Sequence, residues 1–377
     1  MDFTKLTAYL DDLDRLHVPA SDTLVYVNHQ PVYRHFRGFS DFEKTIPMNG
    51  RETYFYFSAT KMYTCTAALQ LIEQGKLGLD DPVSRYIPSF TLLTVAEGDM
   101  TRAARRPMTI RHLMSMTGGL DYDLEARAIQ NTLEMYGKKA TTQQIAAAIG
   151  HKPLQFDPGD DWKYSLGHDV LGAVIEIVSG MTLGSYMQKY LFEPLGIRRM
   201  SFRMNDDLKQ HLCAQYIWDD QQQDAVPMEA TNRYALSDCY ESGGAGLMGD
   251  VESYIPLLDA LACGGMGATG ERILRPETVE LYKTPQLSGK AYDTYFNERK
   301  LGYSYALGVR TMVDPAFRNA RCPVGEFGWD GAAGAYALVD TEHQLSLFHA
   351  QHVRSYGFCY TQEHPVIRDL VYEGLGL

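Results

Sequence analysis

A serine and a lysine three positions apart could carry nucleophilic chemistry in this chain. Ser58 follows the aromatic, strand-like residues 54–57, and Lys61 lies in a helical pattern that ends at Gly75. Residues i and i+3 lie on one face of a helix, so the lysine nitrogen could reach the serine oxygen and take its proton. The alternative is a helix-capping serine with a solvated lysine, and chance alone produces this spacing about once or twice in such a chain. The pair therefore needs support from other segments.

Two further segments could contribute to the same chemistry. Tyr164 opens a helical pattern and could act as a general base if nearby cations lowered its pKa, although most of the 25 tyrosines must be packing or surface residues. Residues 327–336 are rich in glycine and alanine, so a ligand could approach the backbone there. Backbone N–H groups in that segment could form one arm of an oxyanion hole. The alternative is a tight turn or bulge beside Trp329.

Together these segments resemble the serine β-lactamase-like and penicillin-binding-protein-like superfamily, in particular the class C β-lactamases and related carboxylesterases. Ser58-Ala59-Thr60-Lys61 matches the S-x-x-K nucleophile motif of such enzymes. Other segments follow in the order of the family: residues 75–83, residues 113–120, Tyr164-Ser165 after residues 156–159, residues 194–197 and residues 243–247.

The resemblance implies a role for each matching residue. Ser58 would be the acylated nucleophile, Lys61 would help to deprotonate it, and Tyr164 would relay protons to the leaving group. The backbone N–H groups of Ser58 and Ala332 would form the oxyanion hole. Acyl transfer would run through an acyl-serine intermediate that water then resolves. We expect no cofactor and no metal.

Two departures from the lactamase pattern bear on the substrate. Leu166 stands where asparagine is usual, and Trp329-Asp330-Gly331 replaces a motif that usually offers lysine or histidine. Leucine cannot hydrogen-bond a substrate amide, tryptophan carries no full charge, and Asp330 would repel a carboxylate if it pointed inward. These changes favour neutral esters. The predicted substrate-binding residues are Trp329, Asp330, Gly331, Leu166, Tyr122 and Tyr240.

We therefore expect a serine hydrolase, in particular a carboxylesterase that acts on small neutral esters. A β-lactamase or a D-amino acid peptidase of the same superfamily is the first alternative, and a non-catalytic binding protein that kept the fold is the second. An acyltransferase would differ only in the nucleophile that resolves the acyl-enzyme. An α/β-hydrolase is disfavoured, because the chain has no G-x-S-x-G elbow.

Composition limits the partners. The 377 residues carry a net charge of −12, with 35 basic against 47 acidic residues, which argues against nucleic acid or an anionic membrane as partner. No apolar run approaches membrane length and no signal peptide is recognised at the start. The six cysteines are scattered without a C-x-x-C pair, which indicates free thiols in a reducing cytoplasm. We expect a small ester or amide as substrate; the oligomeric state is open.

The elements that must position these residues follow a simple order. Strand patterns occur at both ends and helical patterns in the middle, which predicts an α+β domain built from both termini and interrupted by a helical insertion. The resemblance adds a β-lactamase/transpeptidase-like fold, with a central antiparallel sheet flanked by helices. Residues 1–85 and 266–377 would form the sheet domain and residues 86–265 a mostly helical domain, with the active site between them. Residues 305–310 are predicted as one strand and the basic residues 102–106 as a solvated loop.

Overall fold

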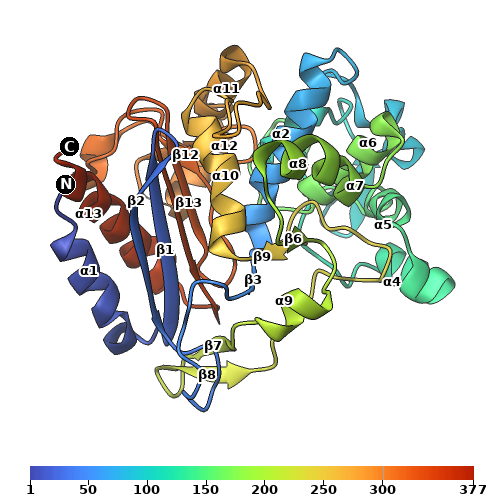
Figure 1. Cartoon of the computed structure of the whole chain (residues 1–377). Coiled ribbons are helices and arrows are strands. Elements are labelled where there is room, and N and C mark those ends of the chain that lie inside the picture. Colours follow the sequence, from blue (N-terminus) through green and yellow to red (C-terminus); the bar gives the residue numbers. More distant parts are fainter. Residues whose placement is uncertain (300) are drawn as a thin grey trace.

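The centre of the structure, a computed structural model that describes residues 1–299 and 301–377, is a seven-stranded antiparallel sheet (Figure 1). The N-terminal hairpin pairs with the C-terminal strands, so both ends of the chain build one sheet. In sheet order the strands are β10 (Tyr303–Tyr305), β11 (Arg310–Met312), β12 (Phe327–Gly328), β13 (Tyr336–Asp340), β14 (Leu345–Gln351), β1 (Ala20–Val27) and β2 (Gln30–Gly38).

Helices cover both faces of this sheet (Figure 1). α1 (Thr4–Asp11) and α13 (His364–Leu375) contact each other on one face, and α10 (Val251–Ala262) packs against β14 and β1 on the other. Aromatic packing joins the layers, since Tyr254 of α10 stacks on Phe348 of β14 with 3.8 Å between the ring centroids. The predicted α+β fold, with a central antiparallel sheet flanked by helices, is confirmed.

The middle of the chain forms a mostly helical region beside the sheet (Figure 1). Its helices are α2 (Thr60–Glu73), α3 (Ile110–Met114), α4 (Arg127–Tyr136), α5 (Thr142–Ile149), α6 (Gly167–Ser179), α7 (Leu183–Met187), which continues through a π-helical turn into α8 (Glu193–Leu195), and α9 (Asp206–Gln210). α11 (Pro276–Lys283) and α12 (Gly289–Arg299) precede β10. Both α2 and α5 pack against α6.

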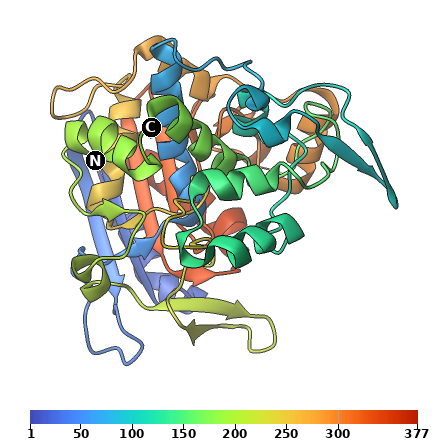
Figure 2. The same ribbon diagram turned by 90° about the vertical axis from the view of Figure 1, so that its right-hand side faces the viewer.

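Three small sheets complete the architecture. In sheet order they are β3 (Tyr54–Phe55), β9 (Met248–Gly249) and β6 (Met200–Ser201); β15 (Val353–Arg354), β7 (Gln215–Asp219) and β8 (Asp224–Met228); and β4 (Thr94–Glu97) with β5 (Met100–Ala103). Figure 2 shows the β4–β5 hairpin projecting from the helical region. The first sheet matters most for function, because β3 leads directly to Ser58.

The predicted division into two domains stays a proposal, with one change. Residues 251–262 fall in the range predicted as the helical domain, yet α10 covers the large sheet. We propose that the sheet domain includes α10 in addition to residues 1–85 and 266–377.

The predicted strand over residues 305–310 is wrong. β10 ends at Tyr305, the chain reverses, and β11 begins at Arg310. Gly308 permits this reversal, because its φ of +82° lies in the left-handed region. A Cβ on Gly308 would also lie 2.2 Å from the Cys65 sulfur of α2. An apolar run of this kind does not show where a turn interrupts it.

The prediction of a solvated loop at residues 102–106 holds for residues 104–106, which lie in no helix or strand, but is wrong for residues 102–103, which belong to β5. Arg102 lies in β5, and its guanidinium donates two hydrogen bonds to Asp157, at 3.0 and 2.7 Å. Hydrogen bonds from Arg102 lower the pKa of Asp157 to about 2. Arg106 donates to the Pro158 carbonyl at 2.8 Å. The two arginines therefore hold the turn that precedes Tyr164.

Within residues 1–299 and 301–377, no single helix has the length and apolar character needed to cross a membrane. The helices over Gly167–Ser179 and Leu183–Leu195 meet that test only as a pair, and they are bent by 71°.

Candidate active site

Ser58 lies where the chain passes from β3 into α2. It belongs to the 3-10 turn Phe57–Ala59, and it is half-buried between two buried neighbours. Phe57 has a φ of +48°, which a bulky residue rarely adopts. Backbone strain of this kind costs on the order of 1–3 kcal/mol and is concentrated at functional sites. The predicted position of Ser58 at the entrance of a helix that stops before Gly75 is confirmed.

Lys61 is fully buried in the first turn of α2. Its Nζ donates to the Gly244 carbonyl at 2.7 Å and to the Tyr122 hydroxyl at 3.2 Å. The same nitrogen lies 4.7 Å from the centroid of the Tyr164 ring. None of the ion pairs between described residues involves Lys61. Its partners are thus a carbonyl, a hydroxyl and aromatic faces, and Ser58 lies three residues before it in the chain.

Tyr164 and Trp329 join this group from two other segments. The Trp329 Nε1–H donates to the Tyr164 hydroxyl oxygen at 3.1 Å. The Tyr164 ring stacks on Trp329 and on Tyr122, with centroid distances of 5.7 and 5.4 Å. The fold thus brings together Lys61, Tyr164 and Trp329 as the sequence patterns led us to expect, and the Tyr122 ring lies 5.4 Å from the Lys61 Nζ.

Gly331 follows β12 and packs against the segment that carries Ser58. A Cβ on Gly331 would lie 2.3 Å from the Tyr56 carbonyl oxygen, so only glycine allows this approach. The Tyr360 hydroxyl donates to the Gly331 carbonyl at 3.0 Å and fixes the turn from the other side. Ala332 follows and is half-buried, like Ser58. The two N–H groups expected in an oxyanion hole therefore belong to segments in direct contact.

Replacing Gly331 with alanine tests this contact. We expect the added methyl group to push residue 332 away from Ser58 and to lower kcat for an ester by about 10²-fold or more, the usual loss for one oxyanion donor. Steady-state kinetics on a short chromogenic ester provide the measurement. Gly98→Ala, in the turn of the projecting β4–β5 hairpin, is the control for an added methyl group, because a Cβ there meets no atom within 4 Å. If kcat of Gly331→Ala equals that of the control, the tight approach has no part in the reaction.

Asp330 does not point toward Tyr164. Its carboxylate pairs with Arg310 at 2.8 Å and lies 3.5 Å from the His364 ring. Burial acts to raise the pKa of Asp330, but Arg310, His364 and Arg299 outweigh it and lower the pKa to about 2. The side chain is therefore a charged part of an ion pair, and because it also lines a cavity beside Trp329, substrate contact by it stays a proposal.

Leu166 and Tyr240 are also engaged elsewhere. Leu166 is only 3% exposed and lines a small hollow with Ile129 and Ile149. The Tyr240 hydroxyl donates to Asp169 at 2.6 Å. Both side chains serve packing or a polar network, so substrate contact by them is not proposed further. Trp329, Asp330, Gly331 and Tyr122 remain candidates.

The sequence patterns did not identify Asp169, a buried residue that supports the hydrogen-bond partner of Lys61. Asp169 of α6 accepts hydrogen bonds from Tyr240 and from Ser242, the latter at 2.5 Å. A Cβ on Gly244 would lie 2.5 Å from the other Asp169 oxygen. Asp169 thereby holds the segment whose Gly244 carbonyl receives the Lys61 hydrogen bond. Asp169 lies five residues after Tyr164, but no local pattern distinguishes it from a surface acid.

Trp329 also borders a cavity of about 170 Å³ that is lined by aromatic rings and two arginines. The Arg299 guanidinium of α12 lies 5.3 Å from the centroid of the Trp329 ring. Its nearest carboxylate partner is Glu298, at 3.6 Å. Cavities near 150 Å³ can hold one aromatic ring. This cavity is therefore a suitable place for one part of a small substrate.

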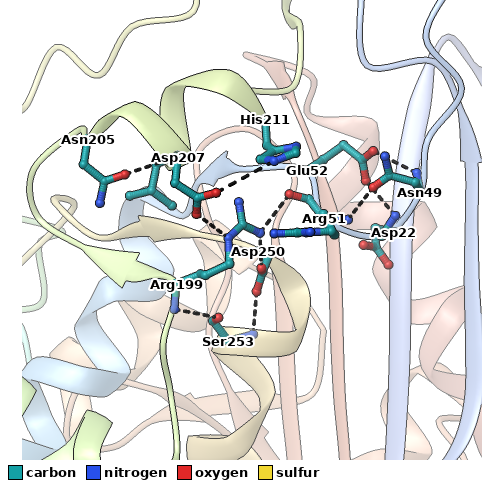
Figure 3. A network of polar contacts seen from close by, with 12 residues as sticks. Asp22, Asn49, Arg51, Glu52, Arg199, Asn205, Asp207, His211, Asp250 and Ser253 are labelled. Carbon is teal, nitrogen blue, oxygen red and sulfur yellow. Dashed lines mark hydrogen bonds and ion pairs between the residues drawn. The ribbon is translucent and has the colours of Figure 1, made fainter.

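A polar network fixes the strand that leads to Ser58 (Figure 3). Arg199 donates to Asp207 at 2.7 Å and to the Arg51 carbonyl at 3.0 Å, and it also pairs with Asp250. The Tyr56 hydroxyl donates to the Asp250 carbonyl at 2.6 Å. Asp250 in turn caps α10. Residues 51–56 are thus held against the start of α10, which limits the movement of Ser58.

The comparisons with known proteins agree with this arrangement. The family model described as Beta-lactamase matches residues 7–353. Esterase EstB of Burkholderia gladioli is 28% identical over 346 residues, which cover 84% of this chain and 81% of that protein. EstCE1, described as a hydrolase with promiscuous acyltransferase activity, is 28% identical with a TM-score of 0.80 and covers 98% of both chains. The LovD6 mutant of simvastatin synthase from Aspergillus terreus, at 21% identity, shares the fold with a TM-score of 0.82 over 100% of this chain and 98% of that one. The chain therefore belongs to the β-lactamase family, within the superfamily of serine β-lactamases and penicillin-binding-protein-like enzymes.

Proposed function

We propose that this protein is a serine hydrolase that works through an acyl-serine intermediate, as a carboxylesterase on small neutral esters. One observation carries the proposal: a buried amine one helical turn after Ser58 meets a phenol from a separate segment, with Lys61 Nζ 4.7 Å from the Tyr164 ring centroid. The 28% identity with an esterase over most of the chain supports the same reaction class.

In the proposed first step, the Ser58 oxygen attacks the ester carbonyl carbon and its proton passes to the Lys61–Tyr164 pair. The N–H groups of Ser58 and Ala332 stabilise the tetrahedral oxyanion, each contributing about 3 kcal/mol. Collapse breaks the bond to the alcohol, and Tyr164 returns the proton to the leaving oxygen. General acid–base help of this kind contributes roughly 10²–10⁴-fold.

In the second step, water attacks the acyl-serine carbonyl and loses a proton to the same pair. The oxyanion forms again, and its collapse releases the acid and restores the Ser58 hydroxyl. An alcohol could take the place of water, which would make the protein an acyltransferase. The description of EstCE1 as a hydrolase with promiscuous acyltransferase activity motivates an assay with an added alcohol.

Neutral esters are favoured by the groups around Tyr164. Trp329 offers an N–H donor and an aromatic face rather than a cation, and Tyr122 adds a second ring. One observation favours the lactamase alternative: the Arg299 guanidinium beside Trp329 could attract an anionic substrate. Because Arg299 lies at the cavity wall, a direct comparison of substrates must decide between the esterase and the lactamase.

That comparison measures kcat/KM for a chromogenic short ester, a chromogenic cephalosporin and a D-alanyl peptide with the same preparation. We expect the ester to exceed both anionic substrates by about tenfold to a hundredfold, the value of one charge-assisted hydrogen bond that Leu166 and Trp329 do not supply. Faster cephalosporin turnover would establish the lactamase alternative. Turnover of no substrate, together with failure of Ser58 to react with a fluorophosphonate probe, would indicate a binding protein.

A further inference from the structure

A histidine, an aspartate and a cysteine meet at the end of α10, far from Ser58. We infer that His29, Asp259 and Cys263 form a binding site for one zinc ion. One ligand atom from each side chain lies within 4.8 Å of the other two. The expectation of no metal rested on local cysteine spacing, which cannot detect ligands that are 230 positions apart in the chain.

The backbone holds the three residues in place. His29 lies at the tip of the β1–β2 hairpin, where Asn28 and His29 both have positive φ, 47° and 65°, as a two-residue hairpin turn requires. Asp259 and Cys263 are four residues apart at the C-terminal end of α10, so they share one face. Two rigid elements thus present the ligands to each other, and neither depends on a long loop.

The contacts between His29 and Asp259 fit a metal site in which one hydrogen bond to a ligand remains after the metal binds. The His29 backbone N–H donates to one Asp259 oxygen at 3.1 Å, and the His29 ring nitrogen Nδ1 lies 2.7 Å from the other oxygen. The first bond would keep the carboxylate oriented after a metal replaced the second. Ligand atoms around a tetrahedral zinc ion are about 3.3–3.6 Å apart, so rotations of the side chains suffice to close the site.

Charge at this end of the helix favours a cation. The carbonyl end of a helix carries partial negative charge, and Asp259 is almost fully buried beside it. Arg272 contacts the residue after Cys263, and its guanidinium donates to the Gly264 and Leu274 carbonyls. That guanidinium is therefore occupied by backbone oxygens rather than by Asp259.

The Cys263 thiol is the third ligand of the proposed zinc site. A divalent cation between Cys263 and Asp259 would bind the sulfur as a thiolate and the oxygen as a carboxylate. Binding would release the thiol proton to solvent, while the imidazole proton would move to Nε2 and leave Nδ1 free to coordinate.

The ligand set selects among metals. One nitrogen, one oxygen and one sulfur ligand suit zinc, whereas magnesium and calcium prefer oxygen alone. Three protein ligands leave a fourth position for water. The site would tie the β1–β2 hairpin to α10, about 20 Å along the helix from Asp250, so its effect is expected on stability rather than on ester chemistry.

Zinc uptake by the intact, metal-free chain tests the proposal. Titration calorimetry should show one zinc ion bound per chain, and cobalt should produce the near-ultraviolet band of a thiolate–cobalt bond. Cys263→Ser should weaken zinc binding by at least about tenfold, the lower range for disturbing a metal site, and should abolish the cobalt band. His29→Asn should weaken binding similarly, while asparagine still tolerates the left-handed turn.

The exposed Cys239 provides the matched control. Cys239→Ser should bind zinc as the unmodified chain does, and zinc should raise the Tm of both. The proposal is overturned if the unmodified chain takes up no zinc, or if Cys263→Ser and His29→Asn bind zinc with unchanged affinity. Circular dichroism of each variant shows whether a lost site reflects a lost fold. Ester hydrolysis by Ser58 does not enter these readouts.

Discussion

Replacing Ser58 with alanine is expected to lower kcat for a short chromogenic ester by about 10⁴-fold or more, as removal of a catalytic serine does in enzymes of this type. The reason is that the other hydroxyl at the entrance of α2, that of Thr60, is fully buried and accepts a hydrogen bond from the Leu247 N–H. Alanine removes only a hydroxyl at a half-buried position, so the fold should be retained. Steady-state kinetics and circular dichroism on the same preparation provide the measurement.

Covalent labelling makes the result specific. A fluorophosphonate probe should modify the unmodified chain at Ser58, as shown by mass spectrometry of the labelled peptide, and should leave Ser58→Ala unlabelled. Ser288→Ala is the matched control, because Ser288 is exposed in a loop before α12. Retention of ester hydrolysis in Ser58→Ala, with labelling at another residue, would move the nucleophile away from α2.

Local patterns predicted the helices well, because each helix has signals within its own segment. α2 stops before Gly75 as its pattern predicted, and α5 begins after Thr141, whose side chain forms a capping box with Gln144. The interruption of the predicted strand at residues 305–310 depended instead on the packing of Gly308 against α2. Tertiary contact of this kind leaves no mark in the period of apolar residues.

The contrast between local signals and contacts that are distant in sequence also applies to the residues of the site. Ser58 and Lys61 lie on one helical turn, so their spacing alone places them together. The direction of Asp330 depends on Arg310 from a neighbouring strand, and the charge near Trp329 comes from Arg299 on α12, which was not predicted. Side-chain partners that are distant in sequence decide which groups face a substrate. A motif identifies the segment but not the orientation of each of its residues.

Replacing Lys61 with methionine is expected to lower kcat by roughly 10²–10⁴-fold, the usual value of general base catalysis. Methionine is similar in length and apolar, so it should fill the same buried space while it removes the amine. The hydrogen bonds to the Gly244 carbonyl and the Tyr122 hydroxyl are lost, but so is the cost of removing a polar amine from water. We therefore expect Tm to stay close to that of the unmodified chain.

Together, kcat and Tm of Lys61→Met distinguish a catalytic role of Lys61 from a structural one. Lys76→Met, at an exposed position just after α2, controls for the loss of one positive charge. If Lys61 acts as the base, kcat falls in Lys61→Met, Tm holds, and the fluorophosphonate probe labels Ser58 much more slowly, because the hydroxyl is no longer deprotonated. If Lys61 serves only to hold Gly244 and Tyr122, Tm falls with kcat, and the fraction that remains folded labels at the normal rate. Normal kcat in Lys61→Met would leave Tyr164 as the only candidate for deprotonation of Ser58 among the residues that meet at this site.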